Sequence, residues 1–322
     1  MSAAPGAGAG GTVGTPASAR QRIAVCICTY QRADVINGLL ERLTHVAEEA
    51  MDVAEVGVVV VDDDPAASAE RVAERYAGTF ELGLVYIRSG AGNISTARNL
   101  ALEHGTQLAD WLALIDDDCL PDLDWLRELL AVQAAHDAEA VSGHCIDEPP
   151  PDGPRWFVDE PFLVESFDHA DGAILESGAL KNTLLSSAFV RRHALLFDEA
   201  FGTIGGEDVM FFRAAHRAGL RHHFASSAVV REQLPTDRAT LAYQLRRALW
   251  HGNTEAVTSV AASRVGRARM MARGAKLVAT SSIRPFRQVV ASKQSEWRFA
   301  LCGVLQGAGR LLGAIGIRLR HR

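Results

Sequence analysis

The sequence predicts an α/β protein with a Rossmann-like, mainly parallel sheet that is flanked by helices. Apolar runs typical of buried strands alternate with stretches of helical periodicity from residue 23 onward. Two of these runs, residues 58–61 and 112–115, end directly in acidic triplets at residues 62–64 and 116–118. The chain has 322 residues, of which 48% are hydrophobic, so it can bury a substantial core.

The expected elements follow one another as βαβ units. Strands are expected over residues 23–29, 56–61, 84–88, 111–115 and 140–145, and helices over residues 34–49, 66–76, 95–104 and 122–136. Residues 147–181 have no clear period and are expected to form a long connection near the substrate. A helix over residues 206–218, an extended stretch over 220–230 and a helix over 238–250 complete the pattern.

Three regions are expected along the chain. Residues 1–20 consist almost only of Ala, Gly, Pro, Ser and Thr and have no basic start or long apolar core, which predicts a disordered tail and not a secretion signal. Residues 21–252 are expected to form the main domain, with halves at 21–120 and 121–252, and residues 253–322 a basic amphipathic helical extension. Because no secretion signal is expected, the main domain is expected in the cytoplasm, where the five cysteines are reduced core residues.

The basic extension predicts an anionic partner. Residues 262–322 contain thirteen Lys and Arg and one acid, Glu296, whereas the whole chain has a net charge of -6. An anionic membrane surface is the expected partner, and no nucleic acid is expected because no reading motif accompanies the charge. The apolar stretch 297–317 is interrupted by Arg298 and Arg310, so a tail lying peripherally on the inner face of the cytoplasmic membrane is favoured over a spanning helix. Helices packed on the catalytic domain are the alternative.

The two acidic triplets predict a ligand site. The carboxyl ends of strands in an open α/β sheet are where ligands bind. Three adjacent carboxylates repel one another, so an attractive partner such as Mg²⁺ or Mn²⁺ shared with phosphates is the leading explanation. A solvated acidic loop is the alternative for either triplet alone.

Five motifs, in order, resemble family 2 glycosyltransferases, which are inverting enzymes of the GT-A fold that use nucleotide-diphosphate sugars. They are VCICTYQR at residues 25–32, VVDD at 60–63, NISTARN at 93–99, IDDD at 115–118 and GGEDVMFF at 205–212. The resemblance spans roughly residues 22–252. It implies a GT-A domain, with the basic helical extension added at its carboxyl end.

The resemblance also implies roles on the donor side. A carboxylate after the second strand can accept a hydrogen bond from a uracil-like base, and Asp63 is the first choice, with Asp62 second. The metal ligands are expected to be Asp118 and Asp116. The other donor-binding residues are expected to be Thr29, Tyr30, Arg32, Asn93, Arg98 and Asp117.

On the acceptor side, the resemblance places the general base at Asp208, with Glu207 holding the acceptor. An acidic pair that only stabilises a helix N-terminus is the alternative. Asn182 is expected to border the sugar, and Arg247 or its neighbour Arg246 to bind the diphosphate. Ala248 stands where processive relatives have Trp, which argues against processive polymerisation.

The expected function is thus an inverting, metal-dependent transfer of a sugar, from a UDP-sugar or another nucleotide-diphosphate sugar, to a glycan or lipid-linked acceptor in cell-surface polysaccharide or glycoconjugate synthesis. A sugar nucleotidyltransferase is one alternative, but residues 29–32 contain no glycine-rich phosphate loop. A non-catalytic membrane scaffold is another, although the acids of the motifs are all present.

Overall fold

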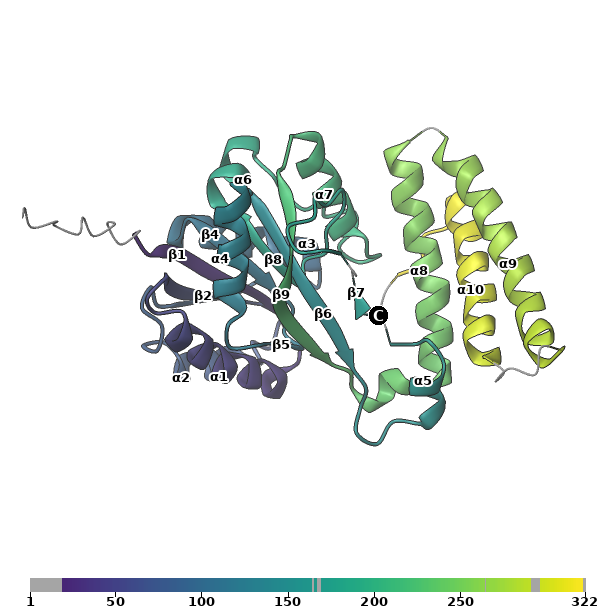
Figure 1. The fold of residues 1–322 in the computed structure, drawn as a ribbon, viewed down its shortest axis with the longest axis horizontal. Coiled ribbons are helices and arrows are strands. Elements are labelled where there is room, and N and C mark those ends of the chain that lie inside the picture. The colour runs from purple at the N-terminus through teal and green to yellow at the C-terminus, as the bar shows by residue number, and fades with distance from the viewer. Residues whose placement is uncertain (1–18, 164, 167–168, 264, 291–295, 321–322) are drawn as a thin grey trace, which may run out of the picture.

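The computed structural model describes residues 19–163, 165–166, 169–263, 265–290 and 296–320. Nearly all of the tail predicted at residues 1–20 lies outside them. The described chain forms a sheet flanked by helices on both faces, beside which stands a layer of three carboxyl-terminal helices (Figure 1). The order of the main strands is β3-β2-β1-β4-β8-β6-β9-β5, and β7 pairs with β6.

The first half of the sheet is parallel, as predicted. It consists of β1 (Gln21–Thr29), β2 (Ala54–Asp62), β3 (Leu84–Arg88) and β4 (Trp111–Ile115). β1 lies between β2 and β4 and pairs with both in parallel. Both acidic triplets therefore emerge at the same edge of the sheet, on either side of the end of β1.

Alternate residues of these strands feed two cores. Val25 and Val58 point toward the face covered by α1 (Ala33–Glu49) and α4 (Trp125–His136). Cys26 and Val59 point toward the face covered by α3 (Ile94–Leu108), α6 (Ser187–His193) and α7 (Glu207–Arg217). Burial on both faces explains why these strands read as continuous apolar runs in the sequence.

The second half of the sheet is mixed. It consists of β5 (Cys119–Pro121), β6 (Ala140–Glu148), β7 (Glu165–Ser166), β8 (Asn182–Ser186) and β9 (His222–Gln233). β8 runs antiparallel to both β4 and β6, whereas β9 is parallel to β6. The short helices α2 (Glu70–Arg75), α5 (Arg155–Asp159) and η1 (Thr236–Ala239) lie in the connections. The parallel pairing that the βαβ pattern predicts thus holds for the first four strands.

The extension folds as α8 (Leu241–Ala262), α9 (Gly266–Val290) and α10 (Trp297–Ala314). α8 is continuous through residues 252 and 253, where the sequence predicted a domain boundary. A Cβ atom on Gly252 would collide with the carbonyl oxygen of Gln306, and a Cβ atom on Gly309 would collide with the carbonyl oxygen of Leu249. The helices α8 and α10 can therefore approach closely because both positions are glycine. Among the described helices, none is long and apolar enough to cross a membrane.

Glu160, beside α5, links the 147–181 connection to α10. Its carboxylate accepts hydrogen bonds from Arg298 Nη1 at 2.9 Å and from the backbone N–H of Phe299 at 2.8 Å. Phe157 and Phe162 pack in one apolar cluster with Phe299. α10 is therefore part of the folded body, as the alternative interpretation of the tail predicted.

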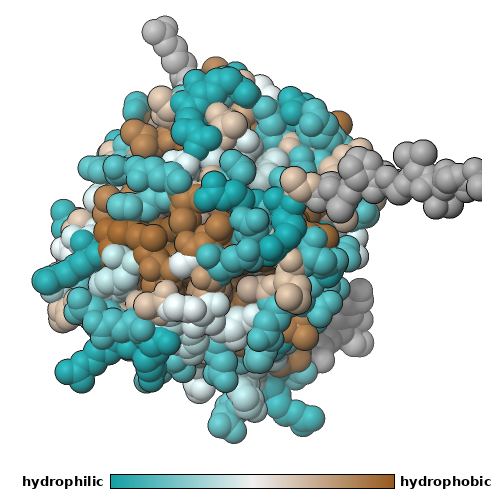
Figure 2. Space-filling model, turned by 90° about the vertical axis from the view of Figure 1, so that its left-hand side faces the viewer, coloured by the Kyte–Doolittle hydropathy of each residue, from teal (hydrophilic) through white to brown (hydrophobic). Residues whose placement is uncertain are grey.

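The opposite end of the molecule, beyond the amino ends of the parallel strands, shows a hollowed apolar area ringed by hydrophilic side chains (Figure 2).

Candidate active site

The two acids predicted to bind the base have different surroundings. Asp62 is fully buried, and both of its oxygens are used: Oδ1 accepts from the Asp64 N–H, and Oδ2 accepts from the Ala69 N–H and the Tyr86 hydroxyl. Asp63 receives all its hydrogen bonds on Oδ1, from Ser89 and the 91–92 backbone, and none on Oδ2 among the described residues. Asp62 thus uses both of its oxygens to hold the loop after β2, whereas Asp63, which is also buried, uses only one of its oxygens among the described residues.

The end of β1 lies against the second acidic triplet. The buried Thr29 hydroxyl donates to Asp117 Oδ2 at 2.8 Å. Arg32 Nη1 donates to Asp117 Oδ1 at 2.9 Å and to Asp118 Oδ2 at 3.0 Å. Tyr30 is 49% exposed, so its ring is open to a ligand. The structure therefore brings the first and fourth motifs into direct contact.

The three carboxylates of this triplet have different environments. Burial raises the pKa of Asp117 to about 6, and the positive charge of Arg32 opposes that rise. Burial also raises the pKa of Asp116, against the effect of Arg98. Asp118 lies between two guanidinium groups, because Arg238 Nη2 is 3.1 Å from the same Oδ2 that Arg32 contacts.

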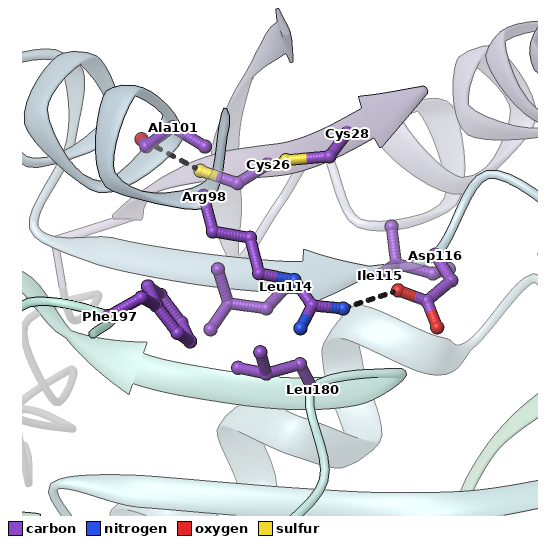
Figure 3. Close-up of a pocket in the computed structure, with 9 residues that line it drawn as sticks. All are labelled: Cys26, Cys28, Arg98, Ala101, Leu114, Ile115, Asp116, Leu180 and Phe197. Carbon is purple, nitrogen blue, oxygen red and sulfur yellow. Dashed lines mark hydrogen bonds and ion pairs between the residues drawn. The ribbon is translucent and has the colours of Figure 1, made fainter. Parts of the chain in front are cut away.

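Arg98 connects the acidic triplet at residues 116–118 to the GGEDVMFF motif at residues 205–212, which the sequence places on the acceptor side and which is called the acceptor motif below. Its guanidinium donates from Nη2 to Asp116 Oδ1 at 3.3 Å and from Nη1 to Glu207 Oε1, and it lies 5.8 Å from the centre of the Phe197 ring. Figure 3 shows this guanidinium directed at Asp116 across a cavity. The cavity has a volume of about 20 Å³, enough for about one water. The cavity is therefore too small to receive a nucleotide.

The acceptor motif is shaped by α8. Gly205 and Gly206 have φ of 77° and 88°, in the left-handed region that favours glycine. A Cβ atom on Gly205 would collide with the ring of Trp250, whose Nε1 donates to the Ile204 carbonyl at 3.1 Å. α8 therefore fixes the turn that begins α7, a contribution that the sequence did not reveal.

The two acids of this turn differ in exposure. Glu207 is 7% exposed, and burial raises its pKa while Arg98 opposes the rise. Asp208 is only half-buried, and its Oδ1 accepts from the Val209 N–H at 2.7 Å. Glu207 is thus paired with Arg98, whereas Asp208 is more exposed and makes no ion pair with a described residue.

Three predicted residues have structural roles or no partner here. Asn93 is the N-cap of α3, and its Oδ1 accepts from the backbone N–H groups of residues 95 and 96. Asn182 is buried: its Oδ1 accepts from Trp125 Nε1 at 2.7 Å, and its Nδ2 donates to the carbonyls of His144 on β6 and Ala228 on β9. Its polar atoms are thus paired inside the sheet, and its predicted place beside a sugar stays a prediction. Arg247 lies half-buried on α8 and makes no ion pair with a described residue.

Sequence reasoning missed a group of charges beside Asp118. Glu232 on β9 is 5% exposed and pairs with Lys181 through Oε2 and with Arg238 Nη1 through Oε1, the latter at 2.8 Å. Arg238 follows the extended stretch without any recognisable motif, so no pattern in the sequence indicated it.

The carboxylate oxygens of Asp116 and Asp118 are suitable ligands for a hard divalent cation that phosphates help to bind. Asp116 and Asp118 offer carboxylate oxygens at the strand ends, and Mg²⁺ usually takes one or two protein carboxylates and completes its shell with waters and phosphates. Within the described residues, the one cluster of three candidate ligands is Cys119, Cys145 and Glu232. Its thiols are soft ligands, and its carboxylate is already paired with two cations, so it does not suit Mg²⁺ or Mn²⁺.

Comparison with known proteins settles the family. A sequence model described as Glycosyl transferase family 2 matches residues 24–215. The chain belongs to this family. It is a glycosyltransferase, as the motifs predicted, and the nucleotidyltransferase and scaffold alternatives are set aside. The matched residues include all five motifs, and they stop before Arg238 and α8.

Two curated relatives are similar over most of their length. The chain is 33% identical over 240 residues to the succinoglycan biosynthesis protein ExoM of Rhizobium meliloti, covering 72% of this chain and 73% of that protein. It is 24% identical over 250 residues to a glucosyl-dolichyl phosphate glucuronosyltransferase of Haloferax volcanii, covering 73% and 77%.

Solved structures share the fold. The mannosyltransferase PcManGT from Pyrobaculum calidifontis, in complex with GDP-Man and Mn²⁺, has a TM-score of 0.58 at 19% identity, covering 92% of this chain and 88% of that one. Residues 1–349 of S. aureus TarS, in complex with UDP-GlcNAc, have a TM-score of 0.53 at 15% identity, covering 89% and 92%. The predicted GT-A fold with a helical extension is confirmed.

Proposed function

We propose that this glycosyltransferase moves a sugar, with inversion, from a nucleotide-diphosphate sugar to a glycan or lipid-linked acceptor in cell-surface polysaccharide synthesis. The observation that carries the proposal is the position of Arg98, which contacts Asp116 on the donor side and Glu207 on the acceptor side. One guanidinium thus joins the strand end where a diphosphate would lie to the turn where an acceptor would lie. The succinoglycan biosynthesis relative supports the choice of pathway class.

The donor nucleotide lies at the ends of β1 and β2 in this proposal. Asp63 Oδ2 accepts from the N–H of a uracil-like base, while its Oδ1 holds the loop at residues 90–92 in place. The exposed Tyr30 ring covers the base or ribose. A UDP-sugar is the proposed donor, because uracil offers an N–H at this edge.

Asp118 and Asp116 would hold the Mg²⁺ or Mn²⁺ ion of the donor complex. Such an ion supplies Lewis-acid stabilisation of the charge that develops on the departing diphosphate. The complex of PcManGT with GDP-Man and Mn²⁺ supports metal use by this fold. Arg32 adds a fixed positive charge on the same side of the site.

Asp208 is the proposed general base. The acceptor hydroxyl gives its proton to the Asp208 carboxylate as its oxygen bonds to the anomeric carbon. The bond from that carbon to the diphosphate breaks in the same step, and its electron pair leaves with the nucleoside diphosphate. Glu207, which Arg98 fixes, lines the acceptor side of the reacting centre.

We propose further that the protein lies peripherally on the inner face of the cytoplasmic membrane, through α9. Arg267, Arg269, Arg273 and Lys276 are all exposed on this helix, close to the exposed Met271. α10 lies against α8 and α9 and buries several small side chains there. The outer face of α9 is therefore the better candidate for contact with anionic lipid than α10.

A thermal-shift screen of nucleoside diphosphates, with and without Mn²⁺, tests the donor site. UDP is expected to raise the melting temperature more with Mn²⁺ than without it, because a ligand that binds only the folded state stabilises it according to occupancy. UDP-sugars are then tested for UDP release with lipid-linked and soluble glycan acceptors. Absence of stabilisation by every nucleotide tried, with metal present, would refute the proposal.

A further inference from the structure

The carbonyl group of Ile204, directly before the acceptor motif, is held by two side chains of α8. Trp250 Nε1 donates to its oxygen at 3.1 Å, and Thr254 Oγ1 donates to the same oxygen at 3.0 Å. The two donors are four residues apart, so they lie on one face of the helix, one turn from each other. Both hydrogen bonds come from a helix that begins after the region matched by the family model.

The acceptor motif begins with two glycines that let α8 approach. A Cβ atom on Gly205 would collide with the ring of Trp250. A Cβ atom on Gly206 would collide with the methyl groups of Thr254 and Thr258. These three side chains follow one another at four-residue spacing, so three consecutive turns of α8 line the turn that begins α7. A movement of this face of α8 would therefore displace the turn.

The position of Asp208 depends on this turn. Asp208 is the second residue of α7, and the N-cap of this helix is Gly206, which has no side chain to cap it. Farther along α7, Arg213 Nη1 donates to the Thr258 carbonyl at 2.7 Å, so the middle of the helix is attached to α8 separately. Loss of the two hydrogen bonds to Ile204 would therefore loosen the start of α7 while the rest of the helix stays in place.

α10 and the residues after it hold the same part of α8. The Asn253 side chain donates from Nδ2 to the Ile317 carbonyl and accepts at Oδ1 from the Leu319 N–H, both at 2.9 Å. Two residues farther along, Glu255 Oε2 accepts from Arg310 Nε at 2.8 Å. Both residues of α8 fall within the three turns that line the start of α7. The carboxyl-terminal extension thus supports the helix face that contacts the acceptor motif.

We propose that Trp250 and Thr254 are positioning residues for the transfer step: through the Ile204 carbonyl they hold Asp208 where its carboxylate reaches the acceptor hydroxyl. This inference rests on the proposed role of Asp208 as general base. A general base must lie within hydrogen-bond reach of the hydroxyl that it deprotonates, so a small displacement of the turn lowers the rate of the chemical step. Affinity for the donor stays unchanged, because the turn lies on the acceptor side of the site.

The first test measures hydrogen exchange of the backbone amides at residues 205–210 in the full chain without any ligand. The double variant Trp250→Phe/Thr254→Val keeps an aromatic ring and a branched side chain but removes both donors. Its amides in this range are expected to exchange faster than those of the wild type, because hydrogen exchange reports local opening. Thr254→Ser, which keeps the hydroxyl, is expected to retain the exchange of the wild type.

The second test measures turnover with the UDP-sugar and the acceptor that the UDP-release screen identifies. The kcat of the double variant is expected to fall about tenfold to a hundredfold, because misplacing a reacting group by about 1 Å can cost this much. The Kd for UDP with Mn²⁺, measured by calorimetry, should match that of the wild type. General damage to the site would weaken UDP binding as well.

A double-mutant cycle shows whether the effect acts through Asp208. In the Asp208→Asn background, adding Trp250→Phe and Thr254→Val is expected to change turnover little, since residues that act as a unit are not additive. In the wild-type background, the same two substitutions should cause the full loss of kcat. The difference between the two losses is the measure of coupling to the base.

Trp111→Phe/Thr44→Val is the matched control. Trp111 Nε1 donates to Gln21 Oε1 at 3.1 Å, and Thr44 Oγ1 donates to the Glu41 carbonyl at 2.7 Å. Both side chains are partly buried, as are the two that they match. The control removes the same two kinds of donor at a distance from the acceptor motif, and it should retain the hydrogen exchange and the kcat of the wild type. Urea unfolding of both double variants checks that they are folded.

The outcomes separate this inference from the proposed function. If Asp208→Asn keeps the turnover of the wild type, the proposed general base is wrong, and hydrogen exchange alone decides whether α8 holds the turn. Unchanged exchange at residues 205–210 in Trp250→Phe/Thr254→Val overturns the inference. An equal loss of kcat with and without Asp208→Asn also overturns it, since the two side chains would then act by another route.

Discussion

Arg98 and Glu207 form an ion pair between two helices, although they are 109 residues apart in the chain. Arg98 is on α3, in the half that carries the donor motifs, and Glu207 is the first residue of α7. Both side chains are largely buried. The pair therefore fixes the acceptor turn relative to the donor strands, and its loss should affect catalysis and stability together.

Glu207→Gln is expected to lower both stability and turnover. The change keeps the side chain's shape but removes the charge that compensates Arg98, which would retain only Asp116. Breaking a buried pair usually costs roughly 3–5 kcal/mol of unfolding free energy, and we expect the lower end because one partner remains. Urea unfolding and steady-state kinetics measure the two effects, with the exposed Glu41→Gln as control. Wild-type stability and turnover in Glu207→Gln would contradict this role.

The sequence predicted the first half of the fold because its signals are local. Apolar runs buried on both faces, such as Val58 to Val61, and the acids that follow them are recognisable without knowledge of distant contacts. The ion pair of Arg98 with Glu207 could not be predicted in this way, since it depends on how α7 folds back on α3. The hydrogen bonds of Asn182 inside the sheet could not be predicted either, because a buried amide and a sugar-binding amide look alike in sequence.

Asp118→Asn is expected to abolish metal-dependent binding of nucleotide and leave the fold intact. The change removes a charged oxygen ligand, while Arg32 keeps Asp117 and Arg238 keeps Glu232 as partners. Isothermal titration of UDP, with and without Mn²⁺, measures the loss. Asp122→Asn, a partly exposed acid that pairs with Arg231, is the charge-matched control. Unchanged Mn²⁺-dependent affinity in Asp118→Asn would rule out this ligand.

Asp208→Asn is expected to lower turnover about a hundredfold or more, which is the scale on which loss of a general base acts. The affinity for the donor should stay near that of the wild type. Asp34→Asn is the matched control, because Asp34 is also an acid in the first turn of a helix. If Asp208 only stabilises the N-terminus of α7, both variants should lose a similar amount of stability and neither should lose turnover. Single-turnover kinetics distinguish the two cases.

His222 is expected to make the folded protein less stable at acidic pH. Burial, with the nearby His216 and His223, lowers the pKa of His222 from 6.5 to about 3. Below about pH 6.5 the unfolded chain therefore binds a proton that the folded protein does not bind until near pH 3, so the free energy of unfolding decreases as pH falls. The slope from this one group approaches about 1.4 kcal/mol per pH unit.

His222→Phe should reduce this slope in urea unfolding between about pH 7 and about pH 5. A phenyl ring preserves the stacking on Phe212, and Ser142 keeps its hydrogen bond with Thr183 at 2.6 Å. The exposed His45→Gln variant is expected to retain the wild-type slope. Equal slopes in the wild type and His222→Phe would contradict the assignment.

Neutralising the exposed face of α9 is expected to abolish binding to anionic vesicles without affecting the donor site. Each Lys or Arg near an anionic surface contributes about 1 kcal/mol, so changing Arg267, Arg269, Arg273 and Lys276 together to Gln should reduce binding strongly. Deleting the whole extension is a poorer test, because α10 holds Glu160 and covers apolar side chains.

The matched control changes four exposed arginines of the catalytic domain, Arg71, Arg75, Arg191 and Arg192, to Gln. It loses the same charge, so co-sedimentation with anionic vesicles should remain close to that of the wild type if the α9 face is the contact. Binding of the wild type should weaken as salt is raised, because screening shortens the range of the attraction. Retention that is insensitive to salt, or equal loss in both variants, would show that the contact is not the basic face of α9. Absence of binding by the wild type would remove the membrane role.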